Sequence, residues 1–134
     1  MSPRLTFGVP RSLASIVAVL VAALPASALA ADPTQEAATA ATHAGFAAQA
    51  TSSEQAHMHL HHTVNCLVGP QGQGFDASEA NPCQKLGNGA IPDTTDAATK
   101  AKLTAALASA QAGLKSDDLT TAKKAGAEAQ KALK

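Results

Sequence analysis

Aromatic residues are almost missing from this chain of 134 residues, which has no Trp, no Tyr and three Phe. It therefore has almost no flat side chains on which the bases of single-stranded nucleic acid stack. Large apolar side chains are also few, because most apolar positions hold Ala. A core built mainly from Ala, Leu and Val buries little area per residue, so we expect modest stability.

A membrane-spanning run of about 20 apolar residues is also absent, but residues 13–24 form a shorter apolar stretch. Arg4 and Arg11 precede it and Ala-Leu-Ala follows at residues 28–30, which is the three-part pattern of a secretory signal peptide. The alternative is an uncleaved anchor, but twelve helical residues rise only about 18 Å against a bilayer core of about 30 Å. We therefore expect export to the periplasm and removal of residues 1–30.

Cleavage would change the charge balance of the chain. Both arginines lie in the leader, so residues 31–134 keep eight lysines against ten acidic residues, a net charge near −2. A weakly acidic chain offers few cationic contacts to phosphate, and we expect no nucleic-acid partner. We also expect no membrane contact after cleavage. The mature chain is short enough to form one domain at most.

The sequence predicts an all-α fold in which residues 31–67 form a long N-terminal helix. Pro33 suits a first helical turn, and Asp32 is a candidate N-cap. The helix is expected to run unbroken or to be bent or interrupted around residues 51–53, where Ser53 would cap a second segment. The heptad spacing that supports this prediction links Phe46, Ser53, Leu60 and Leu67.

Two further regions complete the predicted fold. Residues 68–93 are punctuated by Gly and Pro too often for a long helix or strand, and we expect a loop. Residues 94–134 carry apolar positions at helical spacing on both sides of Gly113, which predicts an antiparallel helical hairpin. Ala and Gly on its seam would let the helices approach closely. The lysines of this hairpin are expected only to face the solvent on the polar sides of the two helices.

The two cysteines are Cys66, just before the loop, and Cys83, inside it. In an oxidising compartment an even number of cysteines is most simply a disulfide, which would tether the loop to the end of the first helix. The rival interpretation makes Cys66 a ligand for Cu(I) or Zn, since it lies four residues after His62. A tethered loop at residues 67–93 would also suit recognition of a protein partner by a structural module.

Four of the five histidines fall in the segment His57-Met58-His59-Leu60-His61-His62. His57 and His61 are four residues apart, so on a helix they share a face and two imidazoles can chelate one ion. Met58 and His62 form a second such pair beside it, and a thioether with imidazoles favours copper, with zinc as the alternative. We therefore predict a metal site with His57 and His61 as primary ligands and Met58 and His62 as secondary ligands.

The other histidines are expected to stay outside that site. His59 points to the opposite side of the helix, and His43 lies roughly 27 Å away along an unbroken helix. His43 would contribute only if the helix breaks and folds back. His57 also borders the apolar stripe, so a buried or capping role without metal is the alternative for it. Glu54, water or another molecule would have to complete the ligand set.

Motifs of common enzymes are missing, so we expect binding and not catalysis. The chain has no His-Glu-x-x-His, no Gly-x-Ser-x-Gly, no phosphate-binding loop and no Cys-x-x-Cys-His. A non-covalent haem held by His and Met is a weaker alternative, because few large apolar side chains are present to line its pocket.

The C-terminal region has an Ala- and Lys-rich helical pattern, whose marker residues are Leu103, Leu107, Gly113, Leu114, Asp117, Asp118, Leu119, Ala122 and Lys123. This pattern resembles the Ala-rich helical repeats of small periplasmic metal-binding proteins. The resemblance spans about forty residues and implies a helical bundle that buffers or delivers metal. This chain departs from the pattern, because its hairpin has no histidine and its histidine cluster precedes a cysteine-flanked loop.

Overall fold

The computed structural model describes residues 30–134, so the predicted signal peptide lies almost entirely outside the described residues. Within the described range the chain forms five helices and no strand, which confirms the all-α prediction. No helix in this range is long and apolar enough to cross a membrane. The helices are α1 (Pro33–Gln49), α2 (Ser53–Val68), α3 (Ala90–Asp93), α4 (Ala97–Gly113) and α5 (Leu119–Ala132).

The four long helices all begin at a polar capping residue. Asp32, Ser52, Asp96 and Asp118 each accept a hydrogen bond from a backbone N–H three residues on. Such a bond satisfies one of the free N–H groups at a helix start. Pro33 follows Asp32 in the first turn of α1, as the sequence predicts.

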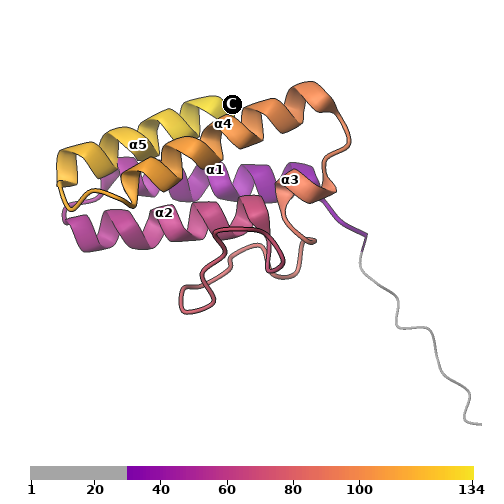
Figure 1. Cartoon of the computed structure of the whole chain (residues 1–134), viewed down its shortest axis with the longest axis horizontal. Coiled ribbons are helices and arrows are strands. Elements are labelled where there is room, and N and C mark those ends of the chain that lie inside the picture. Colours follow the sequence, from indigo (N-terminus) through magenta and orange to yellow (C-terminus); the bar gives the residue numbers. More distant parts are fainter. Residues whose placement is uncertain (1–29) are drawn as a thin grey trace, which may run out of the picture.

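The segment predicted to hold one long helix is divided into α1 and α2. Ala50 has an extended backbone (φ −58°, ψ 149°), and Ser52 caps α2 one residue before the predicted cap, Ser53. The chain therefore reverses over residues 50–52, and α1 and α2 pack against each other (Figure 1). Neither Gly nor Pro marks this turn, so the capping serine is its main local signal.

The long helices form a bundle in which α1 packs on α2 and α5, and α4 packs on the same two helices (Figure 1). In addition, α2 and α5 contact each other across the bundle. Its core is mostly alanine with a few larger residues, among which Leu60 and Leu67 are fully buried. Small residues let the backbones approach closely. A Cβ added at Gly126 of α5 would lie 2.8 Å from the carbonyl oxygen of Ala44 in α1.

Residues 69–89 connect α2 to α3 as a loop beneath the C-terminal end of α2 (Figure 1). A disulfide joins Cys66, in the last turns of α2, to Cys83 in the loop, as predicted. The two ends of the loop meet at Gly69 and Gly89, which have φ of 67° and 116°. A side chain at Gly69 would collide with the backbone of Asn88, so the crossing requires glycine.

Glu36 is a buried acid near the start of α1, where α3 and the end of the loop pack. Its Oε1 accepts a hydrogen bond of 2.9 Å from the backbone N–H of Gly89. Its Oε2 has no hydrogen-bond partner among the described residues, and the Asp93 carboxylate lies close to this acid, so a hydrogen bond between the two carboxyl groups requires one of them to be protonated. Burial, reinforced by the charge of Asp93, raises the pKa of Glu36 from 4.5 to about 7.

Candidate metal centre

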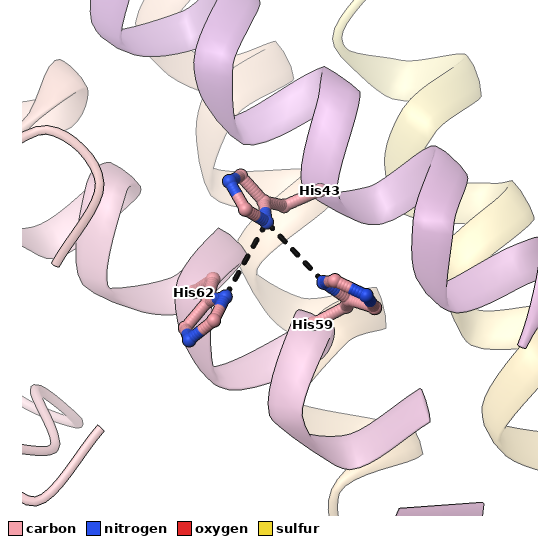
Figure 2. A group of neighbouring side chains, drawn as sticks. All are labelled: His43, His59 and His62. Atoms are coloured by element: carbon pink, nitrogen blue, oxygen red, sulfur yellow. Dashed lines mark hydrogen bonds between the residues drawn. The ribbon is translucent and has the colours of Figure 1, made fainter. Parts of the chain in front are cut away.

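Three histidines from two helices converge between α1 and α2. His43 projects from α1, while His59 and His62 project from one face of α2, three residues apart (Figure 2). The reversal at residues 50–52 brings His43 back alongside α2, although the helical spacing alone would place it far away. The fold therefore assembles a cluster that neither helix contains by itself.

In this His43/His59/His62 cluster, one ring nitrogen of each histidine lies within 4.8 Å of one ring nitrogen of each of the others. His43 Nδ1 is 3.3 Å from His59 Nδ1 and 3.4 Å from His62 Nδ1 (Figure 2). Imidazole nitrogens bound to zinc at 2.0–2.1 Å in a tetrahedral site are separated by about 3.3 to 3.4 Å. The two Nδ1–Nδ1 separations that involve His43 thus already have the length that tetrahedral coordination requires.

The cluster favours uncharged imidazoles. Burial and the neighbouring rings of His62 and His59 lower the pKa of His43 from 6.5 to about 4. Burial also lowers the pKa of His59, and it lowers that of His62 together with the nearby His59. Neutral imidazole is the form that binds a metal, so at neutral pH these three histidines do not have to lose a proton before they coordinate an ion.

Phe46 covers part of the cluster from α1. Its ring centre is 5.7 Å from that of His43, in an edge-to-face arrangement, and 5.2 Å from that of His59. The Phe46 side chain is itself 46% exposed, which makes it one of the large apolar residues that the bundle leaves at its surface. Its contacts with the two imidazoles restrict their rotation and reduce their access to water.

Glu79 lies behind His62, on the side of the ring away from the cluster. Its Oε2 is 3.8 Å from His62 Nε2, while His62 Nδ1 faces His43. Histidine ligands of metals usually donate their second N–H to a carboxylate or carbonyl, which fixes the tautomer and orients the ring. At 3.8 Å the carboxylate of Glu79 is too far away for a direct hydrogen bond, but its charge acts on the Nε2 side of His62 while Nδ1 on the other side faces the cluster.

The loop that carries Glu79 is held on α2 by Asn65 as well as by the disulfide. The buried Asn65 side chain donates to the carbonyl oxygens of Asp76 at 2.9 Å and Ala80 at 3.1 Å, and its Oδ1 accepts from the Asp76 N–H at 2.9 Å. With a fourth, longer contact of 3.5 Å to the Glu79 carbonyl oxygen, one amide thus makes four hydrogen bonds to residues 76–80. The loop position next to His62 is therefore well determined.

The structure places the four ligands predicted from the sequence in different surroundings. His62 belongs to the cluster. His57 Nε2 donates to the Ser116 carbonyl oxygen at 2.8 Å, His61 Nδ1 lies 3.4 Å from an Asp76 carboxylate oxygen, and Met58 is 37% exposed. These contacts do not test whether His57 and His61 chelate an ion, so that pair stays a prediction.

His43 and His59 are the cluster residues that the sequence analysis leaves out of its site. The condition attached to His43, a helix that breaks and folds back, is met by the turn at residues 50–52. His59 does point away from the predicted pair, but together with His62 it forms an i, i+3 pair directed at α1. This second spacing was present in the sequence, and only the packing of α1 distinguishes it from the first.

Comparison with known proteins adds no relative to this description. No protein-family model, curated protein or solved structure matches the chain.

Proposed function

We propose that this protein binds one transition-metal ion, zinc or copper, through Nδ1 of His43, His59 and His62, and that it buffers or delivers this metal after export to the periplasm. The observation that supports it is the convergence of three neutral imidazoles with separations of 3.3 and 3.4 Å. Without an ion these Nδ1 atoms can pair with one another only by sharing protons in hydrogen bonds, whereas an ion engages all three lone pairs at once.

Zinc is the metal we favour. The separations of the Nδ1 atoms match a tetrahedral site, whereas neighbouring nitrogens around square-planar Cu(II) would lie about 2.8 to 3.0 Å apart. The sequence favours copper because of the Met58 thioether, whereas the ligand set proposed here consists of imidazoles alone. Cu(I) is the form of copper that remains compatible with this site, since it does not require a square plane.

An exchangeable ion fits this ligand set better than a structural one. Structural zinc sites are usually closed by four protein ligands, whereas sites with three leave one position for water or an incoming group. The bundle has a disulfide and an apolar core of its own, which stabilise the fold without an ion. A fold that stands without the metal and a site that stays open are both suited to uptake and release.

Zinc binding by protein purified from the periplasm, stripped with a chelator and titrated by calorimetry, tests the proposal. We expect one ion per chain, and we expect His43→Ala/His62→Ala to weaken binding by more than about a hundredfold. The matched control is His57→Ala/His61→Ala, which also removes two histidines but leaves His43, His59 and His62 in place. Loss of binding in the control with retention in the first variant would overturn the proposed site in favour of the His57/His61 pair.

A further inference from the structure

A groove of about 830 Å³ follows α4, bordered by the end of α2, the loop and α3. Val64 and Val68 of α2 are buried and form its floor. Its walls include the half-buried side chains of Ile91, Leu107 and Leu114, which pack on the core and remain partly open to solvent. This size is within the usual range for small-molecule sites, which combine an apolar lining with a few polar groups.

The charged residues that line the groove all have the same sign. They are Lys100, in the first turn of α4, and Lys115, just beyond its end, and no acidic side chain lines the groove. Neither lysine takes part in the ion pairs of the described chain. The remaining polar lining comes from uncharged amides and backbone, such as Gln111. The groove therefore combines an apolar floor with unpaired positive charge, although residues 31–134 as a whole carry a net charge near −2.

We propose that this groove binds a small anionic amphiphile, an apolar chain that ends in one carboxylate or comparable anionic head group. The chain lies over Val64, Val68 and Leu107, where it removes apolar surface from water. The head group pairs with a lysine at the edge of the groove, where both charges keep contact with solvent. A neutral or cationic ligand of the same shape lacks this second interaction.

This site is separate from the histidine cluster. The groove shares no lining residue with His43, His59 and His62, and the proposed ligand contains no group that needs a metal. Binding to the groove therefore stands or falls independently of metal binding. All measurements are made with a chelator present, so failure of the metal proposal leaves the result unaffected.

Displacement of a fluorescent fatty-acid probe by octanoate, decanoate and dodecanoate, below their micelle-forming concentrations, tests the inference. The absence of Trp and Tyr removes protein background from this assay. We expect one site per chain and an affinity that rises about fourfold for each methylene that becomes buried. Dodecanol, which has the same chain without the charge, should bind several-fold more weakly.

Charge reversal provides the matched variants. Lys100→Glu/Lys115→Glu should lower the affinity for dodecanoate by about tenfold or more and leave that for dodecanol much less affected. Lys102→Glu/Lys131→Glu makes the same change of net charge at exposed positions outside the groove, and it should retain binding. Absence of probe binding, equal affinity for dodecanol and dodecanoate, or equal loss in both variants would overturn the proposal.

Discussion

Glu36→Gln should make the protein more stable at pH 8 than the wild type and leave it nearly unchanged at pH 5. In the folded wild type the pKa of Glu36 is raised from 4.5 to about 7. The stability contributed by the protonated acid is therefore complete below pH 4.5 and is lost as the pH rises through 7. Glutamine keeps the acceptor for the Gly89 N–H and supplies a permanent donor to Asp93, so its contribution does not depend on pH.

The magnitude follows from the displacement of the pKa. Ionising Glu36 in the fold costs about 3 kcal/mol more than ionising it in the unfolded chain, at 1.36 kcal/mol for each pH unit between 4.5 and about 7. For a chain of this size that corresponds to a difference in melting temperature on the order of 10 °C or more. His43 has the opposite dependence, because its lowered pKa makes the fold lose stability as the pH falls from 6.5 toward 4. Both proteins contain His43, so the difference between them isolates Glu36.

Thermal unfolding followed by circular dichroism, in chelator and from pH 5 to pH 9, measures this difference. Glu128→Gln is the control, because it removes an exposed carboxylate from α5 without touching the buried pair. Between pH 5 and pH 8 the melting temperature of Glu36→Gln should rise increasingly above that of the wild type. The melting temperature of Glu128→Gln should differ from that of the wild type by the same amount at every pH. If Glu36→Gln also gives a parallel dependence, Glu36 is not the protonated member of the pair and the reasoning fails.

Three further predictions concern the metal site and its loop. Glu79→Gln should weaken zinc binding about ten- to a hundredfold by removing the carboxylate behind His62, whereas Glu54→Gln should not; equal effects in calorimetry would contradict a positioning role. Zinc affinity should stay nearly constant from pH 8 to pH 6, since the pKa of His43 is about 4, and a steep decline near pH 6.5 would show that the histidines titrate normally. Cys66→Ser/Cys83→Ser should lower the free energy of unfolding, measured in urea, by about 3 kcal/mol. It should also weaken zinc binding to the extent that Glu79 becomes free to move. Unchanged stability would show that Asn65 alone holds the loop.

The sequence predicted those parts of the fold that depend on local chemistry. The cap at Asp32 and the glycine-rich loop follow from a few neighbouring residues, and the cysteine pairing follows from the even number of cysteines together with the predicted export. The position of the turn between α1 and α2 was less determined, since Ala50 and Thr51 carry no strong helix-breaking tendency. Only the serine cap indicated it, to within one residue.

The candidate site depends on contacts that a single helix cannot specify. His57 with His61 and His59 with His62 are both good helical pairs, and the sequence offers no local reason to choose between them. The choice is made by α1, which packs on the side of α2 that carries Thr63 and brings His43 to His59 and His62. The role of Glu79 likewise depends on how Asn65 folds the loop back, which is a long-range effect.

The short turn at residues 50–52 gives an ion at this site a mechanical effect on the chain. His43 lies on α1, whereas His59 and His62 lie on α2, and the turn connects these two helices. An ion shared by the three histidines would therefore crosslink α1 to α2. Separation of α1 from α2 would then require the ion to dissociate, whereas the ion could dissociate while the two helices stay packed. Bound metal would thus slow amide exchange along α1 and α2 more than along α4. The rate at which α1 and α2 separate would therefore depend on the concentration of free metal around the protein.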